Sequence, residues 1–171
     1  MWDFGHADLL APEAIGEPGK RTFRLQIRSG EETASLWLEK EQLAALAIGI
    51  RQLLEQTTSP DAPAEPAQAS PIDPLPNDPD VDFKIGRLSL GYDDERQVVL
   101  IFAYTMDVPD SAPPSFRCGI SRGQCETFAD QADEVLRAGR PVCILCETPI
   151  EQDGHQCLRR NGHANHPMSL R

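Results

Sequence analysis

The sequence lacks the local signatures by which many enzymes are recognised. It has no nucleophile elbow, no phosphate-binding loop and no pair of acidic residues in a context typical of acid–base catalysis. Basic residues are scarce too, since 16 Lys and Arg face 27 Asp and Glu and leave a net charge of −11. Because this charge repels a polyanion, the composition disfavours nucleic acid as a partner.

Long apolar runs are also missing. No window approaches the roughly 18 uninterrupted apolar residues of a membrane span, and the N-terminal residues 1–6 show neither the basic nor the apolar region of a secretory signal. The five cysteines are an odd number and include a C-x2-C pair, which fits a reduced compartment and a metal better than a disulfide framework. We therefore expect a soluble, cytoplasmic protein without a membrane span.

The chain is long enough for one ordinary domain and an appendage. We expect an irregular N-terminal arm over 1–21, a first strand-strand-helix half over 22–56, a Pro-rich acidic linker within the domain over 57–82, a second strand-strand-strand-helix half over 83–140, and a zinc-knuckle tail over 141–171. The linker holds seven prolines, six acids and no base, a composition that disfavours a packed structure.

Each half shows strand alternation followed by helical spacing. Residues 22–28 alternate between apolar and polar, a Ser29-Gly30 turn follows, and beyond Lys40 apolar residues recur every three or four positions. In the second half a strand slips phase near Gly86, as at a β-bulge, and Ser121-x-x-Gln124 has the form of a capping box that opens a helix.

A shift of 82 residues superposes the strand, cap and helix stripe of the first half on those of the second. This match indicates a duplicated strand-strand-helix unit, or only the period shared by any strand that precedes an amphipathic helix. In both cases we predict an α+β fold, with an antiparallel sheet of about five strands, two helices on one face and a C-terminal zinc knuckle.

The last 29 residues carry the clearest chemical signal. They have too few large apolar residues to form a core, but they contain five metal-ligand candidates, namely Cys143, Cys146, His155, Cys157 and His163. Zinc binding supplies folding free energy that so short a segment does not obtain from burial. A closed tetrahedral site needs four ligands, so either His155 or His163 completes the three cysteines. We expect a structural zinc ion, because nothing marks a general base beside an open coordination position.

Several motifs together resemble a bacterial family of unknown function. They are the segments Gly16–Phe23, Leu38–Gln42, Gly86–Gly91, Gly139–Cys146 and Gly154–Cys157. The resemblance implies membership of a trio whose other members are similar to a phosphoinositide-kinase-like protein and a histidine phosphatase. It thus implies protein partners and assigns no activity.

The resemblance also bears on the metal site. Leu158 stands where the family usually has proline, which loosens the turn of the knuckle without removing a ligand. The family residue at the position of His163 is often not histidine, and this favours His155 as the fourth ligand.

We therefore expect a non-enzymatic, zinc-binding module for protein interaction, an adaptor. Two alternatives stay open. The first is an enzyme or regulatory subunit that works with the kinase-like and phosphatase-like partners. The second is binding of single-stranded nucleic acid through Arg159, Arg160 and the knuckle. The sequence identifies neither a small-molecule ligand nor an oligomeric state.

Overall fold

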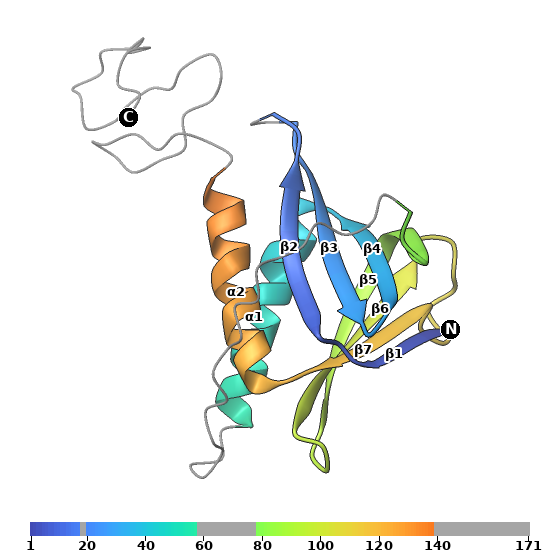
Figure 1. The fold of residues 1–171 in the computed structure, drawn as a ribbon, viewed down its shortest axis with the longest axis vertical. Coiled ribbons are helices and arrows are strands. Elements are labelled where there is room, and N and C mark those ends of the chain that lie inside the picture. Colours follow the sequence, from blue (N-terminus) through green and yellow to red (C-terminus); the bar gives the residue numbers. More distant parts are fainter. Residues whose placement is uncertain (18–19, 58–77, 139–171) are drawn as a thin grey trace, which may run out of the picture.

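A computed structural model describes residues 1–17, 20–57 and 78–138 of the chain. These residues form seven strands and two helices (Figure 1). In chain order the elements are β1 (Trp2–His6), β2 (Leu9–Ile15), β3 (Thr22–Ser29), β4 (Glu32–Leu38), α1 (Lys40–Gln56), β5 (Val81–Asp93), β6 (Val98–Thr105), β7 (Phe116–Ile120) and α2 (Arg122–Arg137). Neither helix is long and apolar enough to cross a membrane.

The sheet is mixed, with the strand order β1-β7-β6-β5-β4-β3-β2. The pairs β1–β7 and β4–β5 are parallel, and the other four neighbouring pairs are antiparallel. The prediction of an antiparallel sheet of about five strands is therefore wrong, whereas the α+β class and the two helices agree with the structure. The two missed strands, β1 and β2, lie in the segment that we expected to be an irregular arm.

The sequence of β2 lacks the alternating pattern by which a strand is usually predicted. Leu10, Ala11 and Pro12 are all buried, so this strand shows no alternation of apolar and polar residues. Proline is tolerated because β2 stands at one end of the strand order and pairs with β3 alone, which leaves no ladder bond to be lost on its other side.

A bend joins the two ends of the sheet. Only Ala7 and Asp8 separate β1 from β2, although these strands stand at opposite ends of the strand order. The N–H of Ala7 donates to the carbonyl of Gly119 in β7, and that of Asp8 donates to the carbonyl of Arg28 in β3, each at 2.8 Å. The sheet therefore curls around its core and leaves the helices along one side (Figure 1).

Strand β5 is the counterpart of this bent strand. Its first part pairs with β4 and its second part with β6, and the register shifts between Ile85 and Arg87. A Cβ atom on Gly86 would lie 2.7 Å from the Cα atom of Met106, so the close approach of β5 to this backbone requires glycine. The predicted bulge near Gly86 is confirmed.

Both helices start directly after a strand, and both start with a capping box. They run side by side in opposite directions (Figure 1). Arg51 of α1 forms ion pairs with Asp130 and Asp133 of α2, and Arg122 at the start of α2 donates to the Leu54 carbonyl at 3.3 Å. Their buried faces, which include Leu43 and Phe128, complete the core inside the curved sheet.

The described chain repeats one arrangement. The bent strand β1–β2, β3, β4 and α1 correspond in order to β5, β6, β7 and α2, and the first part of each bent strand pairs in parallel with the last strand of the other half. Gln42 and Gln124, 82 positions apart, both donate from Nε2 to the carbonyls at a strand bend. These carbonyls are those of Ile85 and Gly86 for Gln42, and of Ala7 and Asp8 for Gln124. The repeated unit is thus larger than the strand-strand-helix unit of our sequence-based expectation, because it includes the bent strand.

Candidate functional site

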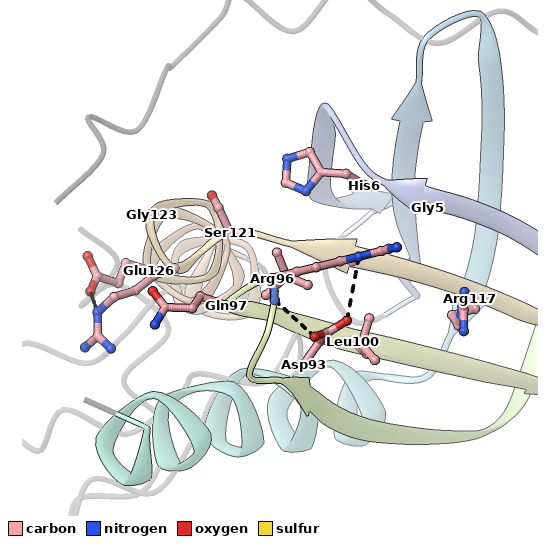
Figure 2. Close-up of a pocket in the computed structure, with 13 residues that line it drawn as sticks. Gly5, His6, Asp93, Arg96, Gln97, Leu100, Arg117, Ser121, Gly123 and Glu126 are labelled. Atoms are coloured by element: carbon pink, nitrogen blue, oxygen red, sulfur yellow. Dashed lines mark hydrogen bonds and ion pairs between the residues drawn. The ribbon is translucent and has the colours of Figure 1, made fainter. Parts of the chain in front are cut away.

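A pocket of about 550 Å³ lies between the end of β1, the turn that joins β5 to β6, and the start of α2 (Figure 2). This volume is within the range of small-molecule sites. Figure 2 shows the side chain of Arg96 extended across the pocket, with His6 on one side and Asp93 on the other. The lining consists of Gly5, His6, Asp93, Arg96, Gln97, Val98, Leu100, Arg117, Gly119, Ser121, Arg122, Gly123 and Glu126.

Three arginines line this pocket, and each has a carboxylate partner. A guanidinium group carries five N–H donors, so one carboxylate leaves donors available to a ligand. The side chains of Arg117 and Arg122 are about a third exposed, and ion pairs of this kind contribute at most about 1 kcal/mol. An incoming anion can therefore compete with the partners. The pairs are Arg96 with Asp93 (3.9 Å), Arg117 with Asp3 (2.5 Å) and Arg122 with Glu126 (3.3 Å).

Asp93, the last residue of β5, stabilises the turn between β5 and β6. The Oδ1 atom of Asp93 accepts hydrogen bonds from the backbone N–H groups of Glu95 and Arg96, both at 3.1 Å. Gln97 has a φ of 53°, in the left-handed region where hairpin turns favour glycine. The sequence thus places an amide side chain at the pocket where glycine would offer none.

The start of α2 forms the opposite side. The Ser121 hydroxyl accepts a hydrogen bond from the backbone N–H of Gln124 at 3.3 Å, and the Gln124 side chain accepts one from the Ser121 N–H at 2.8 Å. This 16-residue helix directs the positive end of its dipole, equivalent to roughly half an elementary charge, toward the pocket. Gly119 and Gly123 add no side chain, which keeps this end of the helix accessible to a ligand.

The first half of the molecule has a different entry to its helix. Trp37, Glu39 and Glu41 stand 82 positions before Gly119, Ser121 and Gly123. The indole N–H of Trp37 donates to Asp82 at 2.8 Å, and the Glu39 carboxylate pairs with Lys84 at 2.7 Å. One scaffold therefore carries a bulky helix start with two acidic side chains in the first half, and in the second a helix start with small, uncharged residues at the three equivalent positions.

The carboxylate that pairs with Arg117 has a lowered pKa. The backbone N–H of Gly5 donates to Asp3 Oδ1 at 2.9 Å, and this hydrogen bond is the main cause of a lowered pKa for Asp3. Burial opposes the shift, and Arg117 adds to it through a hydrogen bond and its charge. Asp3 thus fixes Arg117 beside the pocket across the physiological pH range.

Comparison with known proteins assigns the chain to a family. The family model described as "Protein of unknown function (DUF3090)" matches residues 2–157. The chain belongs to the DUF3090 family. The matched range takes in the whole pocket and Cys143, Cys146, His155 and Cys157, and it ends before His163. No curated protein and no solved structure matches the chain.

Little of the pocket was visible in the sequence of this DUF3090 member. The five predicted metal ligands, Cys143, Cys146, His155, Cys157 and His163, all lie outside the described residues. Residues 1–17, 20–57 and 78–138 hold no cluster of three or more His, Cys, Asp and Glu side chains suited to a metal ion. The capping box was recognised as a helix start, but the arginines gave no signal because they belong to three different elements, the β5–β6 turn, β7 and the start of α2.

The two cysteines of the described domain, Cys118 and Cys125, are core residues. Cys118 and Cys125 are both fully buried. Burial is the main cause that raises the pKa of each thiol to about 12. Because the thiolate is the nucleophile, both residues are chemically inert in the folded state.

We expect a variant in which Cys143, Cys146 and Cys157 are serine to expose no reactive thiol while it is folded. A pKa of about 12 leaves on the order of one thiolate in ten thousand at pH 8. Maleimide labelling followed by mass spectrometry should therefore show no adduct in buffer at pH 8 and two in denaturant. Rapid labelling of either cysteine in buffer would contradict the assignment.

The same shift has a consequence for stability at high pH. Above the ordinary thiol pKa of about 8.5 the unfolded chain releases these protons, while the folded chain retains them until about pH 12. The free energy of unfolding contributed by the two thiols therefore falls as the pH rises through this window. Urea unfolding at pH 8 and pH 10, compared with a Cys118→Ala, Cys125→Ala variant, measures the difference in slope.

Proposed function

We propose that this DUF3090 protein is a non-enzymatic binding module, and that the pocket at the start of α2 takes a small anionic ligand. The observation that carries the proposal is the difference between the two halves. Where the first half has Glu39 and Glu41 at its helix start, the second has Ser121 and Gly123, with three arginines around them. The exchange turns a helix entry that repels anions into one that attracts them.

The acidity of the whole chain does not oppose such a site. Charges beyond a Debye length of about 8 Å are largely screened at physiological ionic strength, so the local lining decides the potential in the pocket. The described lining carries three arginines against two carboxylates, Asp93 and Glu126, and a third carboxylate, that of Asp3, pairs with Arg117 beside it. Glu126 is well exposed and can turn toward solvent when a ligand takes its place.

Gly123→Glu is expected to abolish anion binding while the fold gains stability. The new carboxylate copies Glu41 of the first half and places a negative charge in the pocket, but glutamate suits the first turn of a helix better than glycine does. We expect at least a tenfold loss of affinity for the tightest of malonate, sulfate and inorganic phosphate, measured by calorimetry, together with an unchanged or higher Tm.

Gln131→Glu is the matched control, since it adds the same charge to α2 about two turns beyond Gly123, at a residue outside the pocket lining. Its affinity for anions should stay within about twofold of the unaltered chain. If none of the three anions binds the unaltered chain, or if both variants weaken binding equally, the pocket is not an anion site.

We propose further that the tail holds one structural zinc ion through Cys143, Cys146, Cys157 and His155, with His163 as the alternative to His155. Thiolates and imidazole are the ligands that closed zinc sites use, and two residues between cysteines suit a single tetrahedral ion. The family match supports His155, because the matched range contains it and stops short of His163.

In this proposal the zinc-bound tail is the adaptor element. Its partners would be the phosphoinositide-kinase-like and histidine-phosphatase-like proteins that the family resemblance implies. Direct binding of the full chain to purified proteins of these two kinds, before and after chelation, tests the role. Binding that chelation leaves unchanged would separate the tail from partner recognition.

A further inference from the structure

We infer that the ligand of the pocket is a small phosphomonoester, in which one terminal phosphate is joined to an aliphatic body without an aromatic ring. The inference rests on the proposed function, since it names the class of anion that the pocket takes. Three features of the lining carry it: the number of donors, the balance of charge and the absence of aromatic side chains among the described residues that surround the pocket.

The donors exceed the needs of a carboxylate. Two oxygens of a carboxylate are satisfied by one bidentate arginine. Here Arg96, Arg117 and Arg122 line one pocket together with the first turn of α2. Each guanidinium group has one carboxylate partner, and that of Arg122 also donates to the Leu54 carbonyl, which still leaves N–H donors on all three. Three terminal phosphate oxygens arranged around phosphorus can accept from several such groups at once.

The charge balance points the same way. Each of the three arginines has one carboxylate partner, with Asp3 as that of Arg117, so the ion pairs carry no net charge and the helix dipole adds partial positive charge. A ligand that displaces Glu126 toward solvent leaves the charge of Arg122 uncompensated as well. These positive charges attract a phosphomonoester, with a charge near −2 at neutral pH, more strongly than a phosphodiester with a single negative charge.

The other lining residues indicate what kind of group is attached to the phosphate. Val98 and Leu100 form an apolar wall, while Gln97 and Ser121 offer polar groups beside it. None of the described lining residues is Phe, Tyr or Trp, so the pocket lacks the aromatic surfaces on which proteins commonly stack nucleobases. A short aliphatic or polyhydroxylated body fits this wall better than a nucleoside does.

Calorimetry on the full chain with four probes tests the inference. Glycerol 1-phosphate carries the expected groups, malonate replaces phosphate by two carboxylates, dimethyl phosphate is a diester, and adenosine monophosphate adds a nucleobase. We expect glycerol 1-phosphate to bind at least tenfold more tightly than malonate or dimethyl phosphate, and no more weakly than adenosine monophosphate. Arg96→Gln and Arg122→Gln should each lower its affinity at least fivefold.

Arg87→Gln is the control, because Arg87 lies over the ring of Tyr104, outside this pocket, and its loss should leave binding within twofold. Tighter binding of malonate or dimethyl phosphate would overturn the inference and leave the proposed anion site standing. Tenfold tighter binding of adenosine monophosphate would overturn the aliphatic body. If no probe and no simple anion binds, the proposed function fails with the inference.

Discussion

Replacement of Phe116 by alanine is expected to lower the free energy of unfolding by about 3–5 kcal/mol, the range for large aromatic truncations in protein cores. Phe116 is fully buried in β7, which lies between β1 and β6. Its ring meets that of Phe4 edge to face, with centroids 4.9 Å apart and an interplanar angle of 68°. Loss of this contact removes an apolar link between β1 and β7.

Urea unfolding followed by circular dichroism measures the effect. Since small domains have stabilities of about 5–15 kcal/mol, a loss of this size should move the urea midpoint markedly with little change in slope. Phe83→Ala is the control: Phe83 is in the part of β5 that corresponds to β1, and it is only partly buried, so we expect about 1–2 kcal/mol. Equal effects of the two substitutions would contradict the larger contribution expected of Phe116.

Prediction from the sequence failed for β1, the strand that carries Phe4. The hairpin of β3 and β4, the bulge in β5 and both helices depend on neighbouring residues, and each was predicted from alternation, turn residues or capping boxes. Strand β1 depends on a parallel partner more than 100 residues away, and parallel pairing leaves no local turn signal. The sequence of an arm and that of such a strand are therefore hard to tell apart.

The pocket escaped prediction for the same reason. Its lining comes from β1, the β5–β6 turn and the start of α2, which the parallel pairing of β1 with β7 brings together. Arg96 and Arg122 each read in the sequence as an ordinary charged residue beside a turn or helix. One local signal was available: Gln97 in the turn, at a position where glycine is favoured, marks a side chain retained despite its backbone cost.

Comparison of the two halves of the chain separates residues that maintain the fold from residues that line the pocket. Gln42 and Gln124 close equivalent capping boxes and hold equivalent bends, so both halves keep the elements that maintain the fold. The helix entries differ in size and charge at the three equivalent positions described above. Among the side chains at these positions, only those of the N-cap residues Glu39 and Ser121 take part in the shared capping boxes. A difference of this kind at the pocket, within an architecture that both halves share, is what specialisation of one half for a ligand would produce.

Replacement of a zinc-ligand cysteine is expected to have the second large effect, the loss of the bound metal. We expect the full chain, purified without chelator, to contain one zinc ion, and Cys143→Ser and Cys157→Ser to contain none. Each substitution leaves three ligands, so the site is no longer closed and loses a large part of the roughly 10–16 kcal/mol with which small zinc modules hold their metal. His155→Ala should weaken zinc binding more than His163→Ala. Elemental analysis and competition with a chromophoric chelator measure these differences.

His166→Ala is the control in the same tail, because this histidine lies outside the proposed ligand set and its loss should leave the zinc content at one per chain. A greater loss at His163 than at His155 would reassign the fourth ligand. A metal-free native chain would remove the knuckle and, with it, the adaptor role of the tail. The anion site would be untouched by that result, since every residue in its lining belongs to the domain that ends at Arg137.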